Sequence, residues 1–326
     1  MRAFKIIEEN WICKNQEYRL NKKYFTNKEI IMDTHGFHSC EYLFECYGYC
    51  NNKYGNLHVC EVEIEGELQK SHNRIVSNTI TILRELSQQE IEDILRKESS
   101  LLTPSSWIQV SSKQKLSKEF VLEFKQQVSW MEISKSPYIS ESFISANKDL
   151  LDWIGVCSSR ILSEEFLVDN MAYIEWEYTL SKQKVSEKNL IKIVEFLLRH
   201  KHSDYMASIW CILSTEQDLS EYFIKKYMDY LDLDRISYHQ KLSESFITEN
   251  FDRLNKEYIV EKQKLSEVFL RIHWKDLNWT LIPLFQEMSE KLIDDFSEYV
   301  DWFNVFIKQK ISEEFRSKFK DRLNFI

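Results

Sequence analysis

The stretch W-I-Q-V-S-S-K-Q-K-L-S-K-E-F-V, from Trp107 to Val121, decides the fold of this chain because its pattern returns along the sequence. An apolar residue followed by serine and then Glu or Lys recurs in one register at nine positions, at successive intervals of 23, 23, 23, 34, 23, 23, 23 and 23 residues. The nine serines are Ser117, Ser140, Ser163, Ser186, Ser220, Ser243, Ser266, Ser289 and Ser312. A fixed period of this length is typical of proteins built from stacked structural repeats.

Aromatic residues keep the same register as the serines. The position ten residues before the serine is tryptophan in seven of the nine units, namely Trp107, Trp130, Trp153, Trp176, Trp210, Trp279 and Trp302. Leu233 and Lys256 fill the other two positions, and seven of the nine serines are followed three residues later by phenylalanine. One unit cannot bury a Trp and a Phe by itself, whereas stacked units can, so the pattern predicts a solenoid.

Each unit predicts two short helices. Serine is a preferred N-cap because its hydroxyl accepts a hydrogen bond from an orphan backbone N–H, and Glu in the first turn suits the helix dipole. We therefore predict that residues from about 98 to 326 form an α-solenoid of nine units, with Ser163 and Ser243 at helix starts. Tryptophans that recur at one phase are expected to be mostly buried between units, and the prediction covers Trp130, Trp153, Trp176 and Trp302.

One interval is longer than the others. Between Ser186 and Ser220 the unit holds 11 extra residues, and the apolar run from Leu190 to Leu198 predicts a longer helix there. This unit is expected to interrupt the regular curvature of the array.

A glutamine also recurs through the array, at Gln114, Gln183, Gln217, Gln240, Gln263, Gln286 and Gln309. These side chains could form a row that recognises a ligand, or their amides could satisfy backbone groups at the turn between helices. A residue repeated in nearly every unit is usually architectural, so the second interpretation is favoured. The tryptophan row is likewise expected to be core rather than a stacking surface for bases.

Residues 1–86 differ in kind from the array. Strict alternation of apolar and acidic residues from His58 to Leu68 predicts a β-strand with one wet face, and Arg74 to Leu83 is a second strand candidate. Residues 3–9 and 29–33 predict shorter strands. Residues 39–50 are expected to be helical, and a capping helix is expected to begin after Glu85. The fold class is thus an α+β head, residues 1–86, followed by a mainly α right- or left-handed solenoid of short helical repeats, residues 87–326.

Composition and charge exclude several classes of protein. The chain has 326 residues with only 5 Gly and 3 Pro, which excludes collagen-like and Gly/Pro-rich disordered chains. Its net charge of −9 argues against a general affinity for nucleic acid or anionic membranes. There is no apolar run of 18–20 residues, and the N-terminal M-R-A-F-K-I-I-E-E-N-W lacks a signal-peptide core. Seven cysteines without such a signal are expected to be reduced thiols in the cytoplasm.

Three strings in the head carry a resemblance. They are W-I-C-K-N-Q-E-Y (Trp11 to Tyr18), H-G-F-H-S-C-E (His35 to Glu41) and E-V-E-I-E-G (Glu61 to Gly66). Together they resemble a small N-terminal domain of unassigned function found in tailed-phage and related viral proteins. The matching residues are Cys13, Gln16, Tyr18, Gly36, Phe37, His38, Cys40 and Glu41. The W…L-S-E-E-F array is similar to repeats in large DNA virus and phage proteins, so the resemblance implies a viral source but no activity.

Metal binding is one candidate chemistry for the head. Zinc takes four N or S ligands, and the weak candidates here are His35, His38, Cys40, Cys46 and Cys50. Their spacings lack a pair of C-x-x-C knuckles, so buried thiols are favoured over a metal site and no metal is predicted.

Catalysis in the head is the other candidate chemistry. The order of G-F-H-S-C and E-V-E-I-E loosely resembles that of ADP-ribosyltransferases, which would use NAD as cofactor. In that hypothesis His38 or Ser39 holds the nicotinamide ribose, and one of Glu61, Glu63 and Glu65 is the catalytic carboxylate. A thiol nucleophile at Cys40 is a third option, disfavoured because sequence proximity to His38 does not make a dyad. Common phosphate-binding loops are absent from the sequence.

The leading hypothesis is a non-enzymatic interaction protein of viral or phage origin, whose acidic array binds a protein partner in the cytoplasm. No nucleic acid, membrane or cofactor is expected. The alternative is an ADP-ribosyltransferase-like head that the array targets. The two hypotheses separate on whether His38, Ser39 or Cys40 converges with one of the three glutamates in one pocket.

Overall fold

The computed structural model describes residues 1–13, 16–50 and 56–323. The chain divides into two compact units, Met1–Leu162 and Ser163–Ile326. The first unit contains every strand of the sheets and the first helices of the array, and the second contains helices. The change from strand to helix follows the compositional change near residue 86, because the last strand ends at Glu85 and the next helix begins at Gln88.

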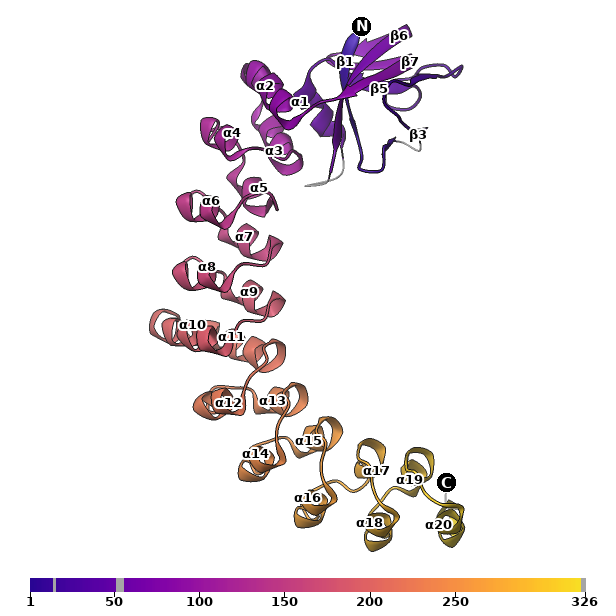
Figure 1. Cartoon of the computed structure of the whole chain (residues 1–326), viewed down its shortest axis with the longest axis vertical. Helices are drawn as coiled ribbons and strands as arrows, with labels where there is room; N and C mark the ends of the chain where they lie inside the picture. The colour runs from indigo at the N-terminus through magenta and orange to yellow at the C-terminus, as the bar shows by residue number, and fades with distance from the viewer. Residues whose placement is uncertain (14–15, 51–55, 324–326) are drawn as a thin grey trace. The chain divides into compact units, whose positions relative to one another are not determined.

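The head is a small antiparallel sheet of five strands in the order β4-β7-β5-β1-β6. The strands are β1 (Arg2–Ile7), β4 (Lys23–Phe25), β5 (Phe37–Cys40), β6 (His58–Ser71) and β7 (Arg74–Glu85), visible at the N-terminal end of Figure 1. Because β6 also pairs with β7, the strands β1, β6, β7 and β5 close into a ring. The short strands β2 (Ile12–Cys13) and β3 (Gln16–Glu17) form a separate pair.

The long hairpin of β6 and β7 supplies most of the head core. Val59, Val62 and Ile64 of β6 are fully or almost fully buried, as the alternation predicts, and Ile80 and Ile82 of β7 pack with them. The strand β6 continues beyond Gly66, where the pairing register shifts between Glu65 and Leu68. Gly66 has a φ of +78°, and a Cβ there would lie 2.2 Å from the Asn78 side-chain oxygen, so glycine permits this bulge.

Two predictions for the head are wrong in detail. Residues 39–50 do not form one helix, because Ser39 and Cys40 belong to β5, and the helical part is α1 (Leu43–Cys46) followed by the 3₁₀ turn η1 (Tyr47–Tyr49). Pairing of β5 with both β7 and β1 overrides the helical pattern of its last two residues. Residues 29–33 form no strand, only an isolated bridge between Ile31 and His35.

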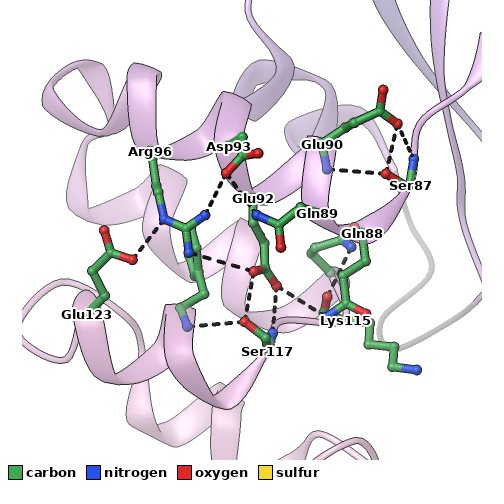
Figure 2. Close-up of polar contacts among 12 residues, drawn as sticks. Ser87, Gln88, Gln89, Glu90, Glu92, Asp93, Arg96, Lys115, Ser117 and Glu123 are labelled. Atoms are coloured by element: carbon green, nitrogen blue, oxygen red, sulfur yellow. Dashed lines mark hydrogen bonds and ion pairs between the residues drawn. The ribbon is translucent and has the colours of Figure 1, made fainter.

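A capping helix connects the sheet to the array, as predicted. Helix α2 (Gln88–Glu98) begins at Ser87, which accepts a hydrogen bond from the Glu90 N–H while the Glu90 carboxylate accepts from the Ser87 N–H (Figure 2). This reciprocal capping box fixes the start of the helix. The helix ends in the 3₁₀ turn η2 (Ser99–Leu101).

The described residues then hold nine pairs of short helices, which confirms the predicted array (Figure 1). The first helices of the pairs are α3 (Pro104–Lys113), α5 (Trp130–Lys135), α7 (Trp153–Ser159), α9 (Trp176–Lys182), α11 (Ser203–Glu216), α13 (Leu233–His239), α15 (Lys256–Lys262), α17 (Ile282–Phe285) and α19 (Trp302–Lys308). The second helices are α4 (Lys118–Glu123), α6 (Glu141–Ala146), α8 (Glu164–Asp169), α10 (Glu187–His200), α12 (Glu221–Tyr227), α14 (Glu244–Glu249), α16 (Glu267–Ile272), α18 (Glu290–Asp295) and α20 (Glu313–Lys318). The extra residues after Ser186 lengthen α10 and α11 to 14 residues each. A last 3₁₀ turn, η3 (Lys320–Leu323), follows α20.

The repeated serines are helix N-caps. Ser163 accepts a hydrogen bond from the Phe166 N–H at 3.2 Å, and Ser243 accepts one from the Phe246 N–H at 3.2 Å, so both predicted helix starts are confirmed. The serine before each of the other second helices stands at the same N-cap position. Ser186 differs in that its hydroxyl donates to the Glu164 carboxylate instead of capping α10.

The tryptophan row belongs to the core, as predicted. Trp176 and Trp302 are buried, and Trp130 and Trp153 are half-buried. The indole N–H donates to the carbonyl five residues earlier, for example from Trp302 to Ser297 at 3.0 Å. Within the described residues, no helix is long and apolar enough to cross a membrane.

Candidate functional site

The glutamine row holds neighbouring repeats together. In the second unit the Gln240 side chain donates to the carbonyls of Ser214 at 3.1 Å and Gln217 at 2.8 Å. Its Oε1 accepts a hydrogen bond from the Leu219 N–H at 3.0 Å. The same three bonds recur at Gln217, Gln263, Gln286 and Gln309. The architectural interpretation is confirmed for these five glutamines, because their amides bond to backbone groups. Gln114 differs, since its Oε1 accepts a hydrogen bond from the Tyr47 hydroxyl at 2.9 Å.

A row of glutamates also links neighbouring repeats. The first glutamate of a second helix accepts from the backbone N–H of the next N-cap serine, as Glu267 does from Ser289 at 2.7 Å. In the first unit Glu92 of α2 makes the equivalent contact with Ser117. The Ser117 N–H and hydroxyl both donate to the Glu92 carboxylate at 2.7 Å (Figure 2). Repeated polar residues are thus structural, and binding specificity has to come from residues that differ between units.

One such set is a row of exposed apolar side chains in the first unit, which we call the α3–α7 row. Ile108, Met131 and Ile154 directly follow the repeated tryptophans of α3, α5 and α7, and are 46%, 57% and 50% exposed. Helix α5 packs against both α3 and α7, so the three side chains lie at one phase of successive stacked helices. In the second unit this position is held by Glu177, Cys211, Asp234, Glu257, Thr280 and Phe303.

The head contains the other candidate site, a cavity of about 760 Å³ beside β1 and β5. Strands β1 and β5 pair only at Phe4 and Cys40. Residues of both strands line the cavity. Lys5, Tyr18, Phe25, Ser39 and Arg74 are among the residues that line it. Its size lies within the roughly 300–1,000 Å³ typical of small-molecule sites.

Lys5 is the central charged group of this cavity. It stands between Ala3 and Ile7 in the inward phase of β1 and is only 6% exposed. Its ammonium donates to the His38 carbonyl at 2.9 Å and lies 5.1 Å from the centre of the Tyr18 ring. No carboxylate of the described residues forms an ion pair with it. Lys5 was not among the predicted site residues, although the alternation of A-F-K-I-I places it inward.

Ser39 faces the same interior. Because Phe4 pairs with Cys40 in an antiparallel register, Ser39 is the cross-strand neighbour of Lys5. Ser39 is 5% exposed, and its hydroxyl has no hydrogen-bond partner among the described residues.

The predicted catalytic residues separate into two places. His38, Ser39 and Cys40 line the cavity, whereas Glu61, Glu63 and Glu65 are not among its lining residues. The Glu61 carboxylate is held by Arg2 at 2.8 Å and by Arg84 at 2.9 Å.

The remaining two candidates, Glu63 and Glu65, also lie outside the lining of the cavity. The side chain of Glu65 pairs with Lys23, which keeps the pKa of that carboxyl below its ordinary value. The convergence that the ADP-ribosyltransferase hypothesis requires is therefore absent from the described part of the head.

The weak metal candidates His35, His38, Cys40, Cys46 and Cys50 all border the cavity. Among the described residues, however, no three His, Cys, Asp or Glu side chains are grouped closely enough to hold a metal ion. Burial raises the pKa of the Cys46 thiol well above its ordinary value, and that thiol donates to the Phe4 carbonyl at 3.3 Å. Packing accounts for the position of Cys46.

A ring-shaped head sheet continuing into stacked helix pairs defines the class of protein: a helical-repeat protein with an N-terminal α+β domain. Residues 1–94 match a family model described as "Domain of unknown function (DUF7666)". The match covers the sheet and the first part of α2, and it confirms an N-terminal domain of unassigned function. No curated protein and no solved structure matches the chain.

Proposed function

We propose that this protein is an interaction protein whose helical-repeat array binds a protein partner. The observation that carries the proposal is the α3–α7 row, Ile108, Met131 and Ile154, about half exposed on three successive helices. These side chains take no part in the hydrogen bonds between repeats. Aligned exposed apolar side chains of this kind mark interaction sites on soluble proteins.

The spacing of the row favours one kind of partner segment. Packed helices lie roughly 8–10 Å apart, so successive members of the row are separated by about that distance. Seven residues of an α-helix advance roughly 10 Å along its axis. An amphipathic helix with apolar residues at every seventh position, lying across α3, α5 and α7, would match the row.

Charge supports a basic partner for the rest of the array. Residues 163–326 contain 30 Asp or Glu and 23 Lys or Arg, so this unit holds most of the excess negative charge of the chain. The proposal accordingly excludes nucleic acid and anionic membranes as partners, because both are polyanions.

The source and compartment belong to the same proposal. A phage or viral source is supported by the resemblance of Gly36, Phe37, His38 and Cys40 to the corresponding string of viral N-terminal domains. A cytoplasmic location is supported by the seven cysteines, which remain thiols.

The test compares capture by two triple variants of the full chain. Ile108→Ser, Met131→Ser and Ile154→Ser are combined in one variant. A matched control combines Leu122→Ser, Leu150→Ser and Ile161→Ser, which are 44%, 47% and 66% exposed in the same unit but outside the row. Proteins retained from the host extract by wild type are identified and their affinity for each variant is measured.

The proposal expects the row variant to lose a partner that the control retains, by roughly tenfold or more in Kd. Equal affinities of the two variants for every captured protein would refute it.

A further inference from the structure

The cavity of the head is independent of the array surface, and its chemistry is that of a ligand site. Buried cations in proteins are normally paired with carboxylates or saturated with hydrogen bonds, since an uncompensated buried charge is costly. Lys5 meets neither condition within the described residues, because its ammonium has one hydrogen bond, to the His38 carbonyl, and one ring contact, with Tyr18.

The neighbouring groups do not supply the missing negative charge. Two thiols, Cys60 and Cys46, interact electrostatically with Lys5, and burial raises the pKa of Cys60 to about 12 and that of Cys46 well above its ordinary value. Both thiols are therefore neutral at physiological pH. Two carboxylates line the cavity, Glu8 and Asp33, and neither forms an ion pair with Lys5 within the described residues. Asp33 is instead bound to Arg74 at 2.6 Å.

Ser39 provides a second, independent sign of a ligand. Its side chain is 95% buried at the cavity wall, and its hydroxyl lacks a partner among the described residues. A buried hydroxyl without a partner is uncommon and marks a place where a further polar group belongs. Because Ser39 is the cross-strand neighbour of Lys5, the two side chains lie on the same face of the sheet.

The mouth of the cavity is apolar and aromatic. Phe25 and Tyr49 line it and are 64% and 56% exposed. Arg74 lies over the Tyr49 ring at 5.4 Å at the same rim, and its charge is paired with that of Asp33. The interior thus favours an anionic group, and the rim favours a planar apolar body.

We propose that the head binds an organic anion with a planar apolar body, whose carboxylate, phosphate or sulfonate group accepts hydrogen bonds from the Lys5 ammonium and the Ser39 hydroxyl. Lys5 is the residue that recognises the charge, and Phe25 and Tyr49 contact the body of the ligand. This site lies in the head and does not depend on the partner proposed for the array.

Two fluorescent probes of nearly the same shape test the site on the full chain. 8-Anilinonaphthalene-1-sulfonate carries a sulfonate, whereas N-phenyl-1-naphthylamine lacks it and is neutral. Titrations are made with wild type, Lys5→Met, Ser39→Ala and the control Lys23→Met, which removes an exposed cation from β4 of the same sheet. Near-UV circular dichroism confirms that each variant keeps its packed core.

The Lys5→Met variant is expected to bind the sulfonate probe roughly tenfold or more weakly and the neutral probe as wild type does. The Ser39→Ala variant is expected to weaken sulfonate binding by a smaller factor, and Lys23→Met to leave it unchanged. If Lys5→Met fails to fold, the Ser39→Ala titration tests the proposal instead. The Ser39 hydroxyl makes no hydrogen bond within the described residues, so its removal breaks none there. Unchanged sulfonate affinity in the folded variants, or equal loss of both probes, would overturn the proposal.

Discussion

The side chain of Gln263 donates a hydrogen bond to the main-chain carbonyl of Gln240 at 2.8 Å, and Gln240 makes the same bond to the residue 23 positions before it. The bond joins equivalent residues of adjacent repeats, so the amides form a ladder through the interior of the second unit. The amides of Gln217, Gln240, Gln263 and Gln286 are almost fully buried. Each supplies both donors and the acceptor that the turn between helices requires.

Removing one step of this ladder should destabilise the array. In Gln263→Ala the carbonyls of Ser237 and Gln240 and the N–H of Leu242 would lose their partners. We expect a loss of about 2–4 kcal/mol, because buried polar groups left without a partner carry most of their desolvation cost. Urea unfolding followed by circular dichroism measures it, with the exposed Gln127→Ala as control. A loss no greater than that of the control would contradict the role of the ladder.

Capping by the repeated serines can be tested within a single helix. Ser243 accepts from the Phe246 N–H at the start of α14. Ser245, two residues further on, is exposed, and its hydroxyl contacts the Ser243 hydroxyl. Ser243→Ala should cost about 1 kcal/mol in the free energy of unfolding, and Ser245→Ala should stay within about 0.5 kcal/mol. Equal effects in urea titrations of the two variants would show that the N-cap bond adds nothing.

Acidic pH should weaken the junction between sheet and array. The Ser87 N–H, the Arg84 guanidinium and the Ser87 hydroxyl hold the pKa of Glu90 at about 2, below its ordinary value of 4.5. Figure 2 shows the contacts of Glu90 with Ser87. A depressed folded-state pKa means that this stabilisation is present above about pH 4.5 and is lost as the pH falls toward 2.

The Glu90→Gln variant should therefore melt below wild type at pH 7, and the difference should close as the pH falls from about 4.5 to 2. Glu67→Gln, at an exposed position of β6, is the control and should show no such convergence. A melting-temperature difference between Glu90→Gln and wild type that stays constant across this pH range would contradict the assignment.

The array could be predicted from the sequence because each of its parts depends on local spacing. Ser163 accepts a hydrogen bond from the N–H of Phe166, three residues later, and Gln217 donates to two carbonyls of the preceding repeat. These contacts recur at a fixed spacing, so the period of the sequence predicts them. Two units have Leu233 and Lys256 at the tryptophan position. The period is still recognisable there, because the serine and the glutamine of both units keep the 23-residue spacing.

The head could be predicted only in part, because its geometry depends on pairing between distant strands. The pair Phe4 and Cys40 closes the ring and places Ser39 opposite Lys5, and nothing local to either residue indicates that contact. Residues 39–50 have a helical pattern, but Ser39 and Cys40 belong to β5 because they pair with β7. The cavity follows from this long-range register, and so the sequence directed attention to His38 and the glutamates rather than to Lys5.

Gly36 is the position in the head where a methyl group should do most harm. Its φ is +107°, and a Cβ there would lie 2.5 Å from the Val76 side chain and 3.0 Å from the Ser77 carbonyl oxygen. The residue immediately precedes β5, so the strain would fall on the strand that lines the cavity. Gly36→Ala should lower the free energy of unfolding of the head by about 2–4 kcal/mol, through backbone strain together with overpacking.

The matched control for this change is Gly48→Ala. Gly48 lies in the 3₁₀ turn η1, and a Cβ there would have no atom within 4 Å. This variant should be neutral or slightly more stable, because alanine restricts the unfolded chain more than glycine does. Thermal unfolding followed by near-UV circular dichroism compares the two variants with wild type. If Gly36→Ala melted as high as Gly48→Ala, the left-handed conformation at residue 36 would not be needed to start β5, and the strand register that brings Ser39 beside Lys5 would have to depend on other contacts.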